Sequence, residues 1–153
     1  MRITTRGRYA LRATLALAKL EKDGGPVSIN TLSEQENISS VFLEQIFFKL
    51  RKAGIVSSIR GPGGGFRFTR SLDKLTVKQI CDAAGEELSL TFCDKSLDEC
   101  ERMGECMSHH VFAEVTDQIN RYFESITLAS ILDKYGEGPF PAVSGNSAPG
   151  KRG

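Results

Sequence analysis

Three cysteines and a histidine lie within one short segment in the second half of this 153-residue chain. Their spacing is Cys-x6-Cys-x5-Cys-x2-His, and the residues are Cys93, Cys100, Cys106 and His109. Thiolate and imidazole groups bind transition metals, and three thiolates with one imidazole complete a tetrahedral zinc site. The residue types and spacing alone therefore predict a metal centre with structural zinc as the simplest occupant. A disulfide switch without metal is the alternative.

Two further residues, Cys81 and His110, are not expected to bind the metal. Cys81 falls on the apolar face of a helix that begins near Thr76, where a small buried residue is the simpler interpretation. Cys106 and His109 are three residues apart at the start of a helical pattern, so both can face one site. His110 points elsewhere on that helix, and we expect it to be a surface or packing residue.

Composition is that of a soluble globular protein, with 40% hydrophobic and 25% charged residues. No apolar run approaches the roughly 20 residues of a membrane span, and the N-terminus lacks the apolar stretch and cleavage site of a signal peptide. We therefore expect a cytoplasmic protein without a membrane partner, in which clustered cysteines bind metal more often than they form disulfides. No catalytic constellation accompanies the acidic residues around the cysteines, so we do not expect an enzyme.

The charges divide the chain into two parts. Residues 1–70 carry 12 Lys and Arg against 5 Asp and Glu, a net charge of +7, whereas residues 71–135 carry 6 against 13, a net charge of −7. A basic half indicates a polyanionic partner, and the acidic half must face away from it.

The elements of the basic half predict a winged helix-turn-helix. Apolar residues recur with helical spacing over 7–22, about 30–36 and about 40–53, with Gly54 placed to end the third helix. The pattern then alternates as in strands around 55–59 and 66–69, on either side of Gly-Pro-Gly-Gly-Gly. The fold class expected is mainly α with a small β-hairpin wing.

Helical patterns also dominate the acidic half. Thr76 and Gln79 match a capping box, which predicts a helix ending near Gly85. After the cysteine loop, spacings of four, four, three and four predict one long helix with the apolar seam Val111, Val115, Ile119, Tyr122 and Ile126, widened by Phe112, Phe123, Leu128, Ile131 and Leu132. This helix carries more apolar surface than so small a domain covers, so we expect it to form a homodimer. Packing on its own N-terminal helix is the alternative.

Candidate DNA-contacting residues follow from the helix-turn-helix. The N-terminal residues of the second helix of such a motif reach base edges, and here they are Ser39, Ser40, Val41, Glu44 and Gln45. Gln45 can bind adenine and Glu44 can accept from cytosine, although a solvated glutamate favoured by the helix dipole is the simpler interpretation of Glu44. Candidates for phosphate contacts are Arg2, Arg6, Arg8, Lys49, Arg51 and Lys52.

The predicted wing adds three further candidates. Arg60 can enter a narrow minor groove, while Gly63 and Gly64 let backbone amides approach phosphates. The glycine-rich turn lacks the Lys-Ser/Thr pair of a nucleotide-binding loop, which argues against that function.

The sequence resembles the iron–sulfur cluster regulator (IscR) family, which is related to the nitric-oxide-sensing repressor NsrR. The resemblance covers about residues 1–133 and rests on MRITTRGRYALRA, on ISSVFLEQIFFKLRKAGIVSSIRGPGGGF, and on the cysteine loop followed by ITLASILD. It implies a dimeric winged-helix transcription factor that binds double-stranded operator DNA, with Glu44, Gln45 and Arg60 at DNA-reading positions. Val41 stands where the family has a small polar residue, so the preferred DNA sequence need not match.

The resemblance also implies an iron–sulfur cluster, [2Fe–2S] in preference to [4Fe–4S], held by Cys93, Cys100, Cys106 and His109. Six residues separate the first two cysteines rather than the family's five. Some relatives take a fourth ligand from an acidic residue of the partner subunit, but Arg8 stands there in this chain, which favours His109.

The expected organisation is thus a DNA-binding domain over residues 1–75, a cluster loop and dimerisation helix over 76–135, and a disordered tail over 136–153. The expected function is transcriptional regulation in response to cluster supply, redox stress or nitric oxide. A zinc-stabilised or thiol-switched regulator, and an iron–sulfur carrier or electron-transfer protein, are the alternatives.

Overall fold

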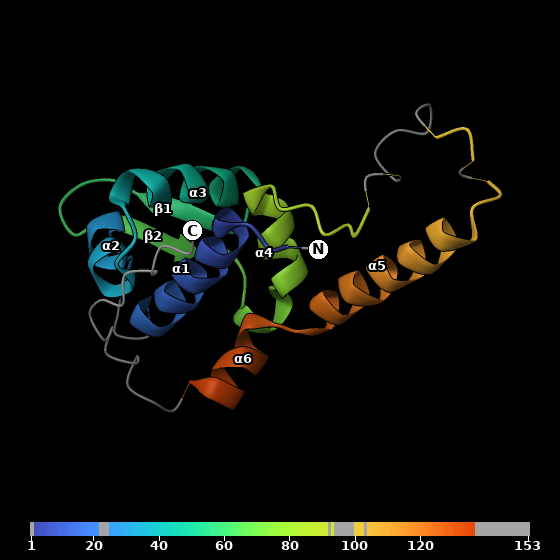
Figure 1. The fold of residues 1–153 in the computed structure, drawn as a ribbon. Coiled ribbons are helices and arrows are strands. Elements are labelled where there is room, and N and C mark those ends of the chain that lie inside the picture. Colours follow the sequence, from blue (N-terminus) through green and yellow to red (C-terminus); the bar gives the residue numbers. More distant parts are fainter. Residues whose placement is uncertain (1, 22–24, 92, 94–99, 103, 137–153) are drawn as a thin grey trace, which may run out of the picture.

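The computed structural model describes residues 2–21, 25–91, 93, 100–102 and 104–136. Figure 1 shows helices packed around a small hairpin, with one helix projecting from the body. In chain order the elements are α1 (Thr5–Glu21), α2 (Ile29–Glu36), α3 (Ser40–Lys52), β1 (Val56–Ile59), β2 (Gly65–Phe68), the 3-10 turn η1 (Leu72–Lys74), α4 (Val77–Ala84), α5 (Met107–Ser125) and α6 (Leu128–Tyr135). Residues 137–153 of the expected tail over 136–153 lie outside the described residues, as does much of the cysteine loop.

A tight turn joins α2 to α3. The Ser28 side chain accepts a hydrogen bond from the Thr31 amide and begins α2, and Asn37 ends it in the left-handed conformation at φ 52°. The Ser33 hydroxyl donates to the Ile38 carbonyl at 2.6 Å, which holds the turn. At the far end of α3, Gly54 adopts φ 72° and confirms the glycine predicted to close that helix.

The wing is the antiparallel hairpin β1–β2, in which Val56 pairs with Phe68 and Ile59 with Gly65. Val27 extends it, because its amide and carbonyl bond to Phe66 at 2.9 and 2.8 Å. The helices and the hairpin confirm the predicted class, mainly α with a winged helix-turn-helix.

One hydrophobic core joins the two halves of the chain. Leu17, Leu32 and Phe47 from the first three helices are completely buried in it. Ile80 of α4 and Leu128 of α6 are completely buried in the same core. The core therefore crosses the expected boundary at residue 75.

The prediction of one uninterrupted helix through Ile126 to Leu132 is wrong. α5 ends at Ser125, and Ile126 is extended, with φ −94° and ψ 117°. The Val77 amide donates to the Ile126 carbonyl at 2.9 Å, and the Leu128 amide donates to the Leu75 carbonyl at 2.8 Å. This pairing satisfies backbone groups that a continuous helix would need for itself, and Thr127 caps a separate helix, α6.

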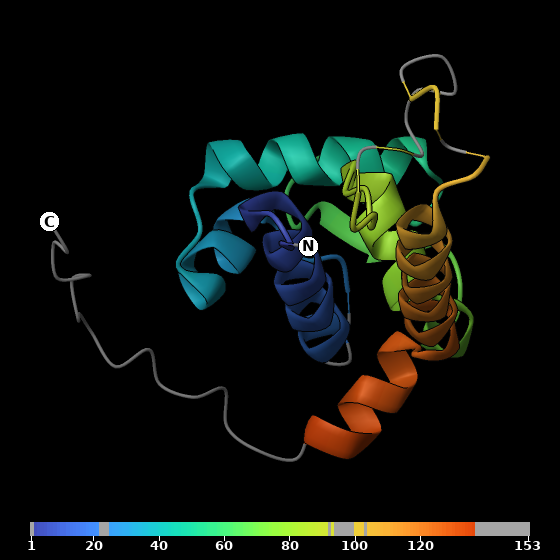
Figure 2. The ribbon, with the colours of Figure 1, turned by 45° about the vertical axis from the view of Figure 1, so that its right-hand side comes forward.

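The α5 helix projects from the body along most of its length (Figures 1 and 2). None of its described residues is fully buried. Phe123 packs near its C-terminal end against Val77, Cys81 and Leu88. None of the described helices combines the length and the apolar character needed to span a bilayer.

Candidate functional site

The predicted base-reading residues occupy the N-terminal half of α3. Ser39, Glu44 and Gln45 are exposed, and Ser40 is half-buried. Ser39 sits at the N-cap position, but its side chain makes no capping hydrogen bond. The Ser39 hydroxyl is therefore not used in beginning the helix.

The same face of α3 carries two exposed apolar side chains. Val41 is 63% exposed and Phe48 is 53% exposed. The cationic groups of Arg51 and Lys52 lie 5.7 and 5.9 Å from the centre of the Phe48 ring, and Arg51 also donates to the Ser58 hydroxyl on β1 at 3.3 Å. The sequence prediction missed Phe48, although a spacing of seven residues from Val41 indicates the same helical face.

The wing presents Arg60 as an exposed side chain directly after β1. The turn itself accounts for the glycines that follow. Gly63 has φ 72°, and a Cβ atom on Gly64 would lie 2.2 Å from the Ile59 carbonyl oxygen. Both positions therefore need glycine for the hairpin, whatever the backbone amides contact.

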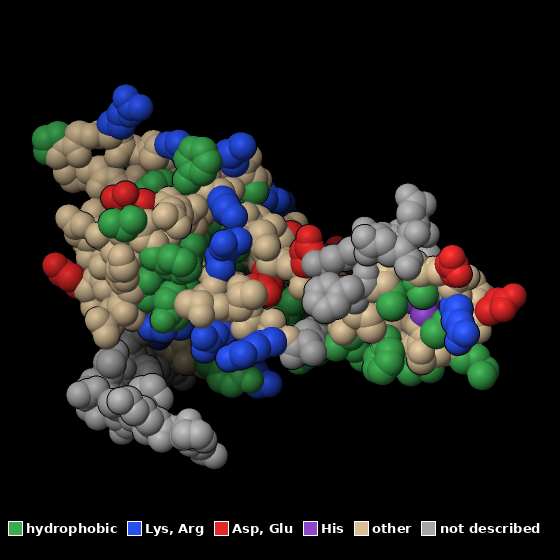
Figure 3. All heavy atoms as spheres, turned by 45° about the horizontal axis from the view of Figure 1, so that its top comes forward, with side chains coloured by type: hydrophobic (Ala, Val, Ile, Leu, Met, Phe, Trp, Pro, Cys, Tyr) green, Lys and Arg blue, Asp and Glu red, His purple; other side chains and the backbone are tan. Residues whose placement is uncertain are grey.

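Basic side chains spread over the body on the side that bears α3 (Figure 3). Two of them approach the C-terminal end of α4. The Lys49 Nζ atom donates to the Ala84 carbonyl at 3.5 Å, and the Arg6 guanidinium lies near Gly85. Cations are favoured at this end of a helix, where carbonyl groups lack intrahelical partners.

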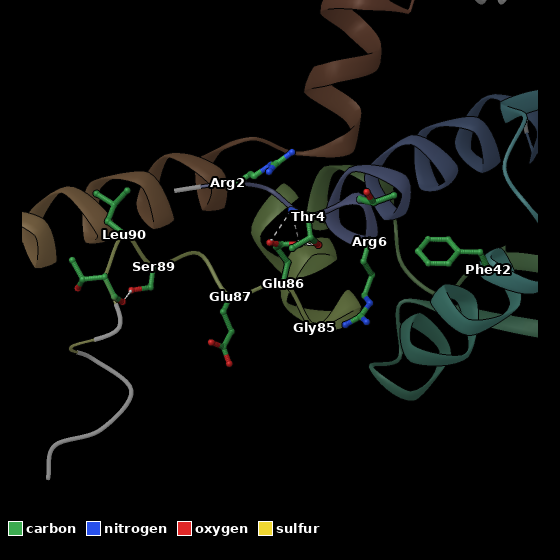
Figure 4. A pocket seen from close by; sticks show the side chains of 11 residues that line it. Arg2, Thr4, Arg6, Phe42, Gly85, Glu86, Glu87, Ser89 and Leu90 are labelled. Atoms are coloured by element: carbon green, nitrogen blue, oxygen red, sulfur yellow. Dashed lines mark hydrogen bonds between the residues drawn. The ribbon is translucent and has the colours of Figure 1, made fainter. Parts of the chain in front are cut away.

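A buried carboxylate fastens the start of the cysteine-bearing segment to α1. Glu86 follows α4 directly and is 5% exposed. Its two oxygens accept from the Thr4 amide at 3.1 and 3.2 Å, and one also accepts from the Thr4 hydroxyl (Figure 4). Gly7 leaves room for it, since a Cβ atom there would lie 2.6 Å from a Glu86 oxygen. The sequence prediction did not identify this contact, for which a glycine inside the first helix was the available signal.

The four predicted metal ligands lie between this contact and α5. Cys93, Cys100 and Cys106 are free, half-buried thiols. Cys106 is the N-cap residue of α5, and its sulfur lies 3.1 Å from the Ser108 hydroxyl. Hydrogen bonding to Ser108, and then to the His109 backbone, lowers the pKa of the Cys106 thiol. His109 is half-buried with its Nδ1 atom inaccessible, whereas His110 is exposed, the first of the two predicted options of a surface or a packing residue.

The structure does not bring these four residues into one group. Within the ranges described, no three side chains of His, Cys, Asp or Glu lie close enough to hold a metal ion. Cys106 and His109 share one helical turn, while residues 94–99 and 103, which separate the cysteines, lie outside the described residues. The donor set itself suits a thiolate-binding metal or an iron–sulfur cluster, because the thiols are free and partly accessible.

Cys81 is also a free thiol but differs from the other cysteines in being buried. It is 3% exposed and packs with Val77 and Leu88, as predicted for a small buried residue. Burial raises the pKa of its thiol to about 11, with further contributions from Glu86 and Asp82. A protonated thiol in this position is a poor metal ligand.

Known proteins with similar sequences are transcriptional regulators. A putative HTH-type transcriptional regulator, ORF2, of Azotobacter vinelandii is 41% identical over 133 residues, which cover 86% of this chain and 79% of the relative. The HTH-type transcriptional regulator IscR of Escherichia coli is 35% identical over 133 residues, which cover 87% of this chain and 81% of the relative.

Solved structures that match this chain include IscR and CymR. The structure of T. potens IscR matches with a TM-score of 0.70 at 30% identity, covering 88% of both chains. CymR, described as the global cysteine regulator of B. subtilis, matches with a TM-score of 0.69 at 28% identity, covering 88% of this chain and 98% of its own. The Rrf2 family model, described as an iron-dependent transcriptional regulator, matches residues 3–134, and this chain therefore belongs to the Rrf2 family of transcriptional regulators.

Proposed function

We propose that this regulator binds operator DNA as a homodimer and that an iron–sulfur cluster controls its affinity. The observation that supports this proposal most directly is a difference in burial among the cysteines. Three free, half-buried thiols precede or begin α5, whereas the fourth is buried in the body with a raised pKa. Thiolates are the usual ligands of iron–sulfur clusters, so the first three have the character that such ligands need. The match to a family model described as an iron-dependent transcriptional regulator supports an iron-containing cofactor.

The proposed ligands are Cys93, Cys100, Cys106 and His109. When bound, the cluster would supply a redox-active and oxidant-sensitive centre. Cys106 would bind readily, since hydrogen bonds lower the pKa of its thiol. His109 lies one turn further along α5 and is half-buried, whereas its neighbour His110 is exposed.

The proposed dimer interface is the apolar face of α5. Val111, Val115 and Tyr122 are 57%, 41% and 65% exposed. A groove of about 620 Å³ runs along this helix between Val115, Ile119, Tyr122 and Phe123. A second copy of α5 would remove this surface from water, and exposed apolar patches of this kind mark interaction sites. Figure 3 shows hydrophobic side chains gathered along the projecting arm.

DNA contacts are proposed for the α3 face and the wing. Ser39, Ser40, Glu44 and Gln45 would meet base edges, and Arg60 with the backbone at Gly63 and Gly64 would meet the minor groove and phosphates. In a symmetric dimer the two copies of α3 would occupy half-sites about one helical turn apart. A change in the geometry of the two α5 helices would alter that separation and hence the affinity.

A thiol-switched regulator is the second candidate. The lowered pKa of Cys106 favours the reactive thiolate, and one structural neighbour is the oxidised form of Staphylococcus aureus CymR, with a TM-score of 0.66 at 26% identity. In that case oxidation of two of the three loop cysteines would replace cluster loss as the signal.

Anaerobic purification with absorption spectroscopy and iron, sulfide and zinc analysis separates these candidates. We expect a coloured protein with iron and sulfide, and His109→Ala should shorten the lifetime of the cluster while His110→Ala leaves it unchanged. Cys81→Ser is the matched cysteine control and should retain the full cluster content. Colourless protein with stoichiometric zinc would refute the cluster proposal, and metal-free protein whose DNA affinity changes on oxidation would favour the thiol switch.

A further inference from the structure

A hollow lies beside the N-terminal half of α3. It has a volume of about 480 Å³, and its lining includes Tyr9, Ile38, Val41 and Phe42. The polar side chains of Ser39 and Gln45 also line it. Val41 is 63% exposed, so an apolar side chain stands in water among residues proposed to read bases. Hydrogen bonding to base edges does not explain an exposed apolar side chain at this position.

The walls of the hollow are held in place before any ligand binds. Tyr9 and Phe42 meet edge-to-face with ring centres 5.7 Å apart. The Arg12 guanidinium lies 5.3 Å from the centre of the Tyr9 ring. Arg12 in turn donates to the Glu36 carboxylate at 3.0 Å and to the Glu36 carbonyl at 2.6 Å. A small apolar group therefore meets a preformed surface and requires little reorganisation of the protein.

We infer that Val41 and this hollow receive the 5-methyl group of a thymine in the major groove of the operator. This inference rests on the proposed function, in which α3 reads base edges. Among the base pairs, only those with thymine present a methyl group in the major groove, and apolar side chains recognise it by contact. Gln45, which also lines the hollow, has the amide that pairs with adenine, so this end of α3 suits an A·T pair. The basic side chains on the side that bears α3 favour a polyanionic partner there.

Phe48 provides an internal comparison on the same helix. It lies seven residues after Val41, about 10 Å along the helix axis at 1.5 Å per residue. It is equally apolar and 53% exposed, but Arg51 and Lys52 lie over its ring and it does not line the hollow. Truncating Phe48 removes exposed apolar surface from the recognition helix without touching the proposed methyl site.

The test uses the full-length protein and DNA that differs by single methyl groups. Operator sequences are first selected from random duplexes, and each thymine of one half-site is then replaced in turn by deoxyuridine, which lacks only the 5-methyl group. We expect one or two replacements to weaken binding of the unaltered protein about fourfold, which corresponds to about 0.8 kcal/mol. Val41→Ala should bind the thymine and uracil versions equally, whereas Phe48→Ala should keep the about fourfold discrimination.

The outcomes separate this inference from the function on which it rests. The selection can enrich a sequence to which the unaltered protein binds equally well when every thymine is replaced by uracil. That result would overturn the thymine inference alone. Discrimination that survives in Val41→Ala would overturn it as well, because the methyl group would then be read elsewhere. If no sequence is enriched at all, base reading by α3 fails and the inference fails with it.

Discussion

Replacing Leu128 with alanine is expected to destabilise the DNA-binding core, although Leu128 lies beyond the cysteine segment and α5. Its side chain is completely buried in the core that also contains Leu17 and Ile80. The substitution removes three carbon atoms from a fully buried site, worth about 2.4 kcal/mol at about 0.8 kcal/mol each. The cavity left behind adds to this loss, so the expected decrease in the free energy of unfolding is about 3 kcal/mol.

Leu132→Ala is the matched control, because Leu132 is one turn later in α6 and only half-buried. We expect it to lower the free energy of unfolding by about 1 kcal/mol, since less of its surface is removed from water on folding. Urea unfolding followed by far-ultraviolet circular dichroism measures both values. The protein should be reduced and metal-free, at one protomer concentration, because ligand binding and dimerisation also stabilise the folded state.

A loss below about 1 kcal/mol for Leu128→Ala, or equal losses for the two variants, would refute this reasoning. Either result would mean that α6 does not belong to the core of the winged helix. The C-terminal end of α5 would then not be anchored to the winged-helix body through α6.

Three further predictions concern the interface, the cysteines and the wing. Val115→Glu should convert the proposed dimer to a monomer in sedimentation experiments, because it places a charge in the apolar groove of α5, whereas Val115→Ala should stay dimeric. A dimeric Val115→Glu would contradict the proposed interface. In metal-free folded protein at pH 8, a thiol reagent should modify the three loop cysteines and spare Cys81, since the reactive thiolate forms only as the pH approaches the raised pKa of about 11. Equal rates for all four thiols would show that Cys81 is accessible. Arg60→Ala should weaken specific operator binding by about 1–3 kcal/mol in titrations, and an unchanged affinity would argue against the wing contact.

Most of the fold could be predicted because its signals are local. Thr76 and Gln79 form the predicted capping box, with both reciprocal hydrogen bonds present. Gly54 takes the left-handed conformation expected after α3. These features depend on neighbouring residues and on helical periodicity, which a single sequence displays directly.

The interruption between α5 and α6 could not be predicted in the same way. The sequence prediction took Leu128 and Ile131 as widening the seam that ends at Ile126, although Leu128 is only two residues after Ile126 and would lie on the opposite side of a continuous helix. The break comes from backbone pairing of Leu75 and Val77 with Leu128 and Ile126, which are about fifty residues later in the chain. The change of phase of the apolar positions at Leu128 indicates a break in the helix, but it does not reveal the distant residues with which Ile126 and Leu128 pair.

Only part of the candidate site could be predicted, because some of its residues lie on helices and others in a loop. Burial of Cys81 follows from the apolar face of its helix, and the structure confirms it. Convergence of Cys93 and Cys100 with His109 depends on loop conformation, which helical periodicity does not determine. The ligand set therefore stays a prediction, supported by donor chemistry and by the similarity to IscR.

The attachment of the cysteine-bearing segment to the body suggests how a ligand there would reach the recognition helix. The segment leaves the body at Glu86, which is hydrogen-bonded to Thr4 at the start of α1. The helix that follows it returns at Ile126, which is hydrogen-bonded to Val77 at the start of α4. Both attachments therefore lie at the ends of α4, and Lys49 of α3 donates to Ala84 at the second end of that helix. A displacement of α5 would move α4, and α4 contacts α1 and α3 directly. In the proposed dimer, a bound ligand then needs only to favour one placement of α5 to change how the two copies of α3 are presented to DNA.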